Sequence, residues 1–281
     1  MAFELPEALN IANQMDKELK GKKIKHAIID EKESASQLRM KMINLQPKEF
    51  TSTLEGRTFK SIHSQGKGIY VDLGNDLNLI FGLETSGKLL FHKNIATIPD
   101  KWNVRIDFTD STALSYRIIA WGWCQVLTTE KLIAHRWLGK EEVSLVDDKA
   151  FTFQVFSNYL DKYASKPIKF ILIRQGEALS GIGNGYLQDI LFKAKIHPKR
   201  KARDIAEDER KNLHSIIKQT LKDALKLGGR DSEVDLYDKP GKYKIILDKR
   251  MIGKPCPECG TTIEKSNILG STCYVCPICQ K

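Results

Sequence analysis

The sequence predicts an α+β protein, and three observations support this class. Apolar residues recur at helical spacing from Pro6 to Lys20, and Gly21 is a suitable helix stop. β-rich runs separated by turn residues then continue to about residue 128. From Thr129 the apolar residues return to helical spacing, and five of the six cysteines crowd into the last 26 residues.

Three regions follow from these patterns. Residues 1–128 are expected to form an antiparallel β unit with a leading helix, because "GIYVDLGNDLNLIFGLETSGKLLFH" places Gly-Asn-Asp and Ser-Gly between β-prone runs. Residues 129–229 are expected to be helical, with an apolar face that ends at Gly228-Gly229. Residues 230–281 read as a polar linker and a cysteine-rich tail.

The charge balance favours a polyanionic partner. Lys and Arg number 45 against 35 Asp and Glu, a formal net charge of +10. Nucleic acid and an anionic membrane surface both fit, and a solvated basic surface is the alternative. No apolar run approaches the roughly 20 residues that span a bilayer, and the first residues lack a signal-peptide h-region. We therefore expect a cytoplasmic protein without membrane contact.

The tail carries a metal-site pattern. Cys256-Pro-Glu-Cys259 and Cys276-Pro-Ile-Cys279 are separated by sixteen residues, a spacing typical of four thiolates around one tetrahedral zinc ion. Such a site has no open position and is structural. Cys273 also forms Cys-x2-Cys with Cys276, so the ligand set is not unique, and paired redox motifs remain an alternative.

A glycine-rich turn precedes a basic segment. In Gly181-Ile182-Gly183-Asn184-Gly185, backbone N–H groups at a helix start can hold a phosphate, although a tight turn between packed helices would look the same. The cations that follow are Lys193, Lys195, Lys199, Arg200, Lys201 and Arg203.

Together these motifs resemble the formamidopyrimidine-DNA glycosylase / endonuclease VIII family over nearly the whole chain. The resemblance rests on "ELPE" at the N-terminus, "SGIGNGYLQDILFKAKIHPKR", and the finger sequences "GKPCPECG" and "CPICQK". Gly66-Lys67 before a β run and Leu138-Gly139 before the helices also fit.

The resemblance implies a two-lobed, monomeric enzyme of base-excision repair. Its parts would be an N-terminal helix with a β-sandwich, a helix-two-turn-helix domain and a zinc β-hairpin finger. Its partner would be double-stranded DNA with a damaged or abasic site, from which a base is extruded before glycosylase and AP lyase chemistry. Lys67, Gly183, Asn184, Lys199 and Arg200 would contact DNA.

The family's nucleophile is the amine of an N-terminal proline, with a glutamate as acid/base and a second glutamate in support. Glu4 and Glu7 match these glutamates, although a helix N-terminus favours acidic residues in any protein. Phe3 replaces the proline, and removal of Met1 would expose the Ala2 amine one residue too early. We therefore expect impaired catalysis.

Three further positions depart from the family pattern. Ser271 stands where the finger carries an arginine, Thr85 where a Met intercalates, and Ile119 where a second arginine stands. Trp121 matches the aromatic wedge and can stack on bases, unless it belongs to the core.

Two alternatives stay open. One is an active glycosylase/AP lyase that uses the amine of Ala2 or Lys67, because a desolvated lysine can form a Schiff base. The other is a zinc-finger module that binds RNA or protein.

Overall fold

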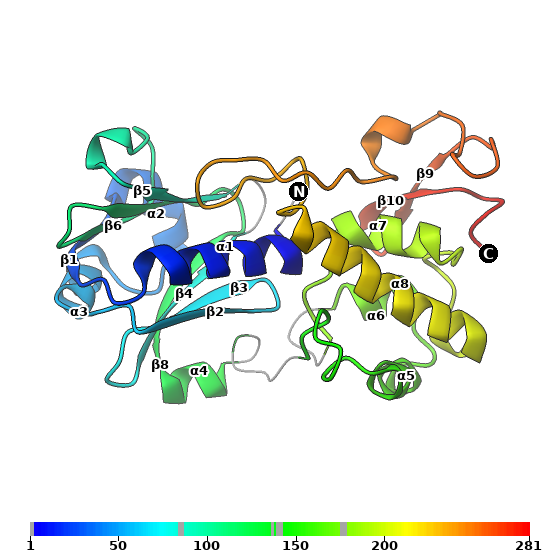
Figure 1. Cartoon of the computed structure of the whole chain (residues 1–281), viewed down its shortest axis with the longest axis horizontal. Helices are drawn as coiled ribbons and strands as arrows, with labels where there is room; N and C mark the ends of the chain where they lie inside the picture. Colours follow the sequence, from blue (N-terminus) through cyan, green and yellow to red (C-terminus); the bar gives the residue numbers. More distant parts are fainter. Residues whose placement is uncertain (1–2, 84–86, 136–137, 139–142, 175–178) are drawn as a thin grey trace. The chain divides into compact units, whose positions relative to one another are not determined.

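The computed structural model of the 281-residue chain describes residues 3–83, 87–135, 138, 143–174 and 179–281. The chain divides into two units, and each is built from two separate stretches of sequence. Unit 1 comprises Met1–Lys140 and Gly228–Lys242, and unit 2 comprises Glu141–Leu227 and Tyr243–Lys281 (Figure 1). The sequence suggested divisions after residues 128 and 229; the structure instead returns 228–242 to unit 1 and joins the tail to the helices.

Unit 1 contains two four-stranded antiparallel sheets, which confirms the predicted antiparallel β unit. The first has the order β1-β6-β7-β5, with β1 (Ile24–Ile29), β6 (Val104–Phe108), β7 (Ala113–Arg117) and β5 (Lys88–His92). The second has the order β2-β3-β4-β8, with β2 (Ser61–Gln65), β3 (Gly68–Asp72), β4 (Leu77–Gly82) and β8 (Trp123–Thr128). Inward-facing residues of both sheets share one apolar core, for example Ile106 and Phe81, so the unit is a β-sandwich.

Helix α1 (Leu5–Leu19) belongs to the same core. Its apolar residues Ala8, Ile11 and Met15 are fully buried, and Pro6 lies in the first turn, where a missing N–H costs nothing. The predicted leading helix is therefore confirmed.

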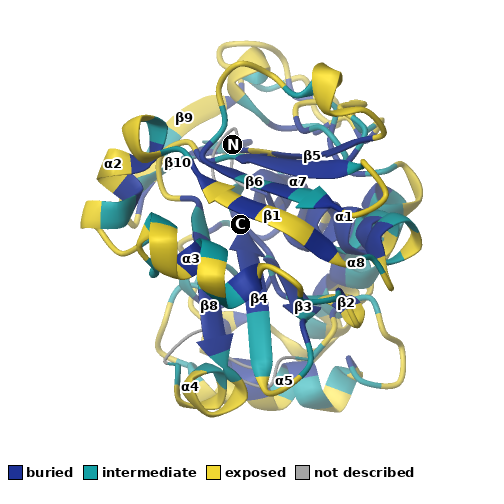
Figure 2. Cartoon of the chain, turned by 90° about the vertical axis from the view of Figure 1, so that its left-hand side faces the viewer, coloured by how far each residue is buried: buried dark blue, intermediate teal, exposed yellow. Residues whose placement is uncertain are grey.

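Three more helices lie in unit 1: α2 (Glu31–Arg39), α3 (Pro47–Leu54) and α4 (Thr129–Ala134). The sequence reading expected only strands where α2 and α3 occur. Their start signals are local: the Asp30 side chain accepts from the Glu33 N–H (2.9 Å), and Pro47 opens α3. Figure 2 shows that both helices present mostly exposed faces, so their apolar pattern is weak.

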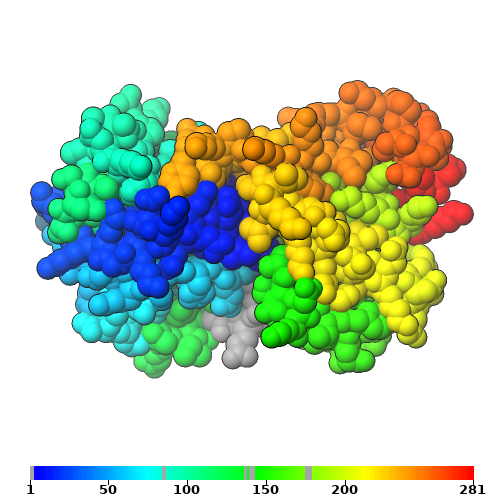
Figure 3. All heavy atoms as spheres, in the orientation of Figure 1, coloured from blue at the N-terminus to red at the C-terminus, as the bar shows by residue number. Residues whose placement is uncertain are grey.

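The segment Gly228–Lys242, which we call the return segment, lies along α1 (Figures 1 and 3). Leu236 is fully buried in the core, and its N–H donates to Gln14 Oε1 (3.0 Å). The Tyr237 hydroxyl donates to Glu18 Oε1 (2.7 Å), and the Phe91 N–H donates to the Leu236 carbonyl (2.9 Å). These contacts make the return segment an integral part of unit 1.

Unit 2 combines helices with a hairpin. Its elements are α5 (Phe153–Lys162), α6 (Ile168–Leu172), α7 (Asn184–Lys193), α8 (Glu207–Lys226), β9 (Glu264–Ile268) and β10 (Ser271–Val275). The buried Asp189 carboxylate on α7 accepts from the Ile246 and Leu247 N–H groups (2.9 and 3.1 Å) and from the Tyr243 hydroxyl (3.0 Å). The tail is thereby fixed to the helices.

The shorter 3-10 helices are η1 (Ile95–Thr97), η2 (Ala202–Asp204) and η3 (Lys249–Met251). Among the described residues, no helix is both long and apolar enough to cross a membrane.

Candidate active site, phosphate-binding turn and metal centre

The two predicted glutamates lie together at the start of α1, in unit 1. Glu4 precedes the helix and Glu7 is its third residue, and the Glu4 N–H donates to Glu7 Oε2 (3.0 Å). Both side chains are buried, with exposed fractions of 1% and 3%. A third residue, Arg230 of the return segment, joins them: its Nη1 donates to Glu4 Oε1 (3.1 Å) and its Nε to Glu7 Oε1 (3.2 Å). Arg230 has no exposed surface.

Sequence reasoning missed Arg230, because it lies 223 positions beyond Glu7 in a stretch that reads as a polar linker. The one local sign is Gly229, whose φ of +93° suits glycine. A Cβ there would lie 2.9 Å from Glu7 Cγ, so the glycine permits the close approach. Burial raises the pKa of the neighbouring Glu233, and the charge of Arg230 opposes that rise.

Phe3, at the position where the family pattern has a proline, belongs to the apolar core with 1% of its surface exposed. Its nitrogen is part of a peptide bond, since Ala2 precedes it. Ala2 itself lies outside the described residues, as do Thr85 and Gly139. Lys67 is half-buried in the turn between β2 and β3 of unit 1.

Trp121 lies in the connection between β7 and β8 and exposes 69% of its surface. The alternative that it is a core residue is therefore excluded. Ile119, two residues earlier, is also exposed. A large apolar surface at the tip of a connection is available for stacking or wedging.

The glycine-rich turn lies in unit 2, with Gly183 directly before α7 and Asn184 as its first residue. The Asn184 side-chain amide contacts the hairpin, because its Nδ2 donates to the Thr272 carbonyl (2.8 Å). Gln188 Nε2 donates to the same carbonyl (3.2 Å), and the Tyr274 N–H donates to Gln188 Oε1 (3.1 Å). The predicted phosphate-binding turn therefore packs against the β9–β10 hairpin.

The predicted basic segment contains two kinds of cation. Lys199 and Lys201 are exposed. Arg200, in contrast, donates from Nη1 and Nη2 to the two Glu209 carboxylate oxygens (2.6 Å each) and from Nη2 to the Asp204 carbonyl (2.6 Å). Its guanidinium fixes the start of α8, which leaves the lysines and the exposed Arg203 as the accessible charges.

Ser271, where the family pattern has an arginine, binds a buried lysine instead. Lys169 of α6 has no exposed surface, and its Nζ donates to Ser271 Oγ (2.7 Å), the Ile268 carbonyl (2.7 Å) and Cys273 Sγ (3.1 Å). Cys273 is therefore a partner of Lys169. Sequence reasoning missed Lys169, which reads as an ordinary lysine in an amphipathic helix.

The other four tail cysteines converge, with sulfur atoms within 4.8 Å of one another. The Cys256–Cys279 and Cys259–Cys276 separations are 3.9 and 3.4 Å. Metal–sulfur bonds of about 2.3 Å in a tetrahedron place sulfurs about 3.8 Å apart, so the cluster fits a metal ion. Hydrogen bonds from Thr261 lower the pKa of Cys259 to about 6, and the hydrogen bond between the Cys259 and Cys279 sulfurs raises the pKa of Cys279 to about 12.

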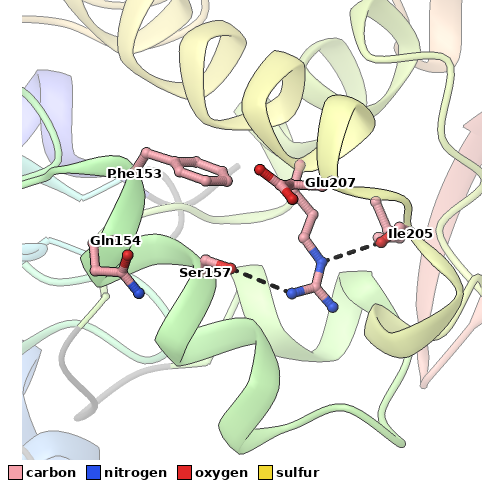
Figure 4. A pocket seen from close by; sticks show the side chains of 6 residues that line it. Phe153, Gln154, Ser157, Ile205 and Glu207 are labelled. Atoms are coloured by element: carbon pink, nitrogen blue, oxygen red, sulfur yellow. Dashed lines mark hydrogen bonds between the residues drawn. The ribbon is translucent and has the colours of Figure 1, made fainter.

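A surface pocket of unit 2 contains none of the residues predicted from the sequence. It is lined by Phe153, Gln154, Ser157, Ile205, Glu207 and Arg210 (Figure 4). The Arg210 guanidinium crosses it and donates to Ser157 Oγ (3.3 Å), the Ile205 carbonyl (3.1 Å) and Asp161 Oδ1 (2.7 Å). These bonds join α5 to α8, which is a structural use of the charge.

Comparison with known proteins matches both units. Residues 3–117 match the formamidopyrimidine-DNA glycosylase N-terminal domain, and residues 138–235 match the H2TH domain of the same enzyme. The formamidopyrimidine-DNA glycosylase of Ligilactobacillus salivarius is 30% identical over 99% of this chain and 98% of its own length. That of Lactococcus lactis subsp. cremoris is 26% identical over 99% of both chains.

Solved structures agree. The Lactococcus lactis Fpg in complex with DNA containing an abasic site aligns with a TM-score of 0.84 at 25% identity, covering 99% of both chains. MutM in complex with DNA containing carbocyclic 8-oxo-G aligns with a TM-score of 0.83 at the same identity and coverage. The chain therefore belongs to the formamidopyrimidine-DNA glycosylase / endonuclease VIII family.

Proposed function

We propose that this chain binds double-stranded DNA at damaged or abasic sites on a glycosylase/AP lyase scaffold whose own chemistry is impaired. The observation that carries the proposal is Phe3, a buried core residue whose nitrogen is an amide. An amide cannot form the Schiff base with which the family's amine attacks the sugar, whereas a free α-amine, with a pKa near 8, can.

Each unit offers residues of its own that suit DNA. The start of α7 at Gly183 and the exposed Lys199 and Lys201 suit phosphate groups, because backbone N–H groups and ammonium groups both favour anions. The exposed indole of Trp121 suits stacking on a base or filling a gap in the duplex. Neither use requires a covalent step.

We also propose that zinc binds Cys256, Cys259, Cys276 and Cys279. A four-thiolate site gives zinc no open position, so the ion would supply folding energy to the hairpin and no reaction step. The support is the sulfur geometry, with one sulfur atom from each of the four cysteines and all four within 4.8 Å of one another.

Two measurements test the DNA proposal. Fluorescence anisotropy should show binding to a duplex with a tetrahydrofuran abasic analogue at low salt, with affinity that falls steeply as salt rises. Borohydride treatment with a true abasic duplex should trap no covalent adduct. Absence of duplex affinity at low salt would overturn the proposal, and displacement by RNA but not by duplex DNA would favour the interaction-module alternative.

An adduct in the trapping assay would instead favour an active lyase, and two changes then locate its amine. Loss of the adduct in Lys67→Ala identifies the lysine. Persistence in Lys67→Ala, with loss when an uncleaved leader blocks the Ala2 amine, identifies the N-terminus.

A further inference from the structure

We propose that Arg230 turns Glu4 and Glu7 into a buried structural lock between α1 and the return segment, in place of an acid/base pair. The inference goes beyond the proposed function, because it rests on contacts within unit 1 and holds whether or not the chain binds DNA. It adds a second obstacle to catalysis that is independent of Phe3.

The Arg230 guanidinium donates hydrogen bonds to the carboxylates of both Glu4 and Glu7. Nε and Nη2 of Arg230 donate to the two oxygens of Glu7 (3.2 and 3.3 Å), and Nη1 donates to Glu4 Oε1 (3.1 Å). The Arg230 backbone N–H adds a fourth bond, to Glu7 Oε1 (3.0 Å). Such fork-shaped pairing is the strongest ion-pair geometry in proteins.

The hydrogen bonds to the carboxylate oxygens explain why this arrangement opposes acid/base chemistry. Arginine keeps its proton under all ordinary conditions, and here it is fully buried between its partners. A general acid or base must present a carboxylate oxygen to the reacting group, whereas both oxygens of Glu7 and Oε1 of Glu4 already accept hydrogen bonds from Arg230.

The position of the cluster explains what it secures. The return segment enters unit 1 at Gly228-Gly229, directly before Arg230, and its later residues are held by Gln14 and Glu18 of α1. Arg230 therefore anchors the segment close to its entry point, and it contacts the first turn of the helix. Its removal should loosen the segment at its entry point.

A double-mutant cycle tests the lock. Arg230→Met should lower Tm by about 10 °C, because it leaves the buried Glu4 and Glu7 carboxylates without their cation. Glu7→Gln should lower Tm by about 5 °C, because Arg230 then keeps only Glu4 as an ionic partner. The double variant should lie at least 5 °C above the sum of the two effects, since Glu7→Gln removes one of the two carboxylates that Arg230→Met leaves without a cation. Additive effects, or single effects below about 2 °C, would overturn the proposal.

Hydrogen exchange supplies a local readout and a matched control. In Arg230→Met, amides of residues 229–237 should exchange at least tenfold faster, while those of α8 keep their wild-type rates. Arg200→Met breaks a doubly bonded arginine of unit 2 and should leave 229–237 unchanged. If no variant folds, wild-type exchange decides: an Arg230 amide that exchanges within seconds contradicts the lock, and one as protected as the α1 core supports it.

Duplex affinity is measured in parallel so that the two proposals fail separately. Absence of duplex binding by the wild-type chain would overturn the proposed function but not the lock. Additive effects in the double-mutant cycle would overturn the lock but not DNA binding.

Discussion

Phe3 directly precedes Glu4, and Arg230 contacts both Glu4 and Glu7, yet only Phe3 could be found from the sequence. Phe3 was identified because "ELPE" sets a register, and the residue before it must then be the nucleophile position. Arg230 has no such register, since its partners are more than 220 positions away and depend on how the chain returns. Short-range motifs thus predict which residues are inherited, and long-range packing determines what those residues contact.

Trp121 is the residue for which exposure separates a binding role from a core role. Trp121→Ala should lower the affinity for the abasic duplex about tenfold, because base–aromatic stacking contributes about 1–3 kcal/mol. The same change should move Tm by less than 2 °C, since 69% of the side chain is exposed. Met40→Ala, at another exposed apolar residue of unit 1, serves as the control and should alter neither quantity. Unchanged affinity in Trp121→Ala would remove the residue from the interface.

Asp189 predicts an unusual pH dependence of stability. Burial raises its pKa to about 6 from an ordinary 3.8, despite the hydrogen bonds from Leu247, Tyr243 and Ile246. Between these values the folded state binds more protons than the unfolded state, so this group's contribution is full below pH 4 and is lost as pH rises through 6. The total is about 3 kcal/mol. In denaturant unfolding, the free energy of unfolding of Asp189→Asn should therefore rise relative to that of the wild type as pH increases from 4 to above 6.

Asp148 provides a control of opposite sign. Hydrogen bonds from Lys218 and Lys222 lower its pKa to about 2, so its stabilisation is present above the ordinary pKa and is lost as pH falls toward 2. Asp148→Asn should accordingly have a lower free energy of unfolding than the wild type at pH 6, and the two values should be equal near pH 2. A wild-type minus Asp189→Asn difference that is flat from pH 4 to 7 would contradict the assignment to Asp189.

At the scale of elements, the sequence predicted those whose signals are continuous along the chain. The leading helix, the hairpin strands and α8 all have strong periodicity or clear turn residues, and the structure contains them. Helices α2 and α3 were missed because each is short and offers few apolar residues to bury, so only the N-cap Asp30 and the first helical residue Pro47 mark them. The four cysteines were found because metal-ligand spacing is itself a local signal.

The hairpin that carries these cysteines makes a specific metal prediction. The purified chain should contain one zinc per molecule, released by a thiol-blocking mercurial and measured with a metallochromic dye. Cys276→Ser should lose the ion and the exchange protection of β9 and β10, because a tail this small depends on its metal to fold. Cys273→Ser should retain the zinc, since that sulfur contacts Lys169. Equal loss in both variants would show that the ligand set includes Cys273.

At the scale of the whole chain, the two structural units do not follow the linear order of the sequence. Each unit takes its residues from two stretches, so the linear division at 128 and 229 could not anticipate that the return segment completes the β-sandwich. Net charge, in contrast, can be read from the sequence without knowing the fold. The excess of ten positive charges is distributed over both units, and its effect on a polyanion is felt before any particular contact forms.

Salt dependence measures how much of that charge acts in binding. The logarithm of duplex affinity should fall linearly with the logarithm of salt concentration, with a slope near −0.9 for each phosphate neutralised. Lys199→Ala should weaken binding to all duplex sequences alike and make the slope shallower by about 1. Lys48→Ala, at an exposed lysine of α3, should leave both unchanged if binding is local, because net charge alone would make the two substitutions equivalent. Equal effects of Lys199→Ala and Lys48→Ala would show that the chain attracts DNA only through its overall field, and the basic segment after α7 would then have no special role.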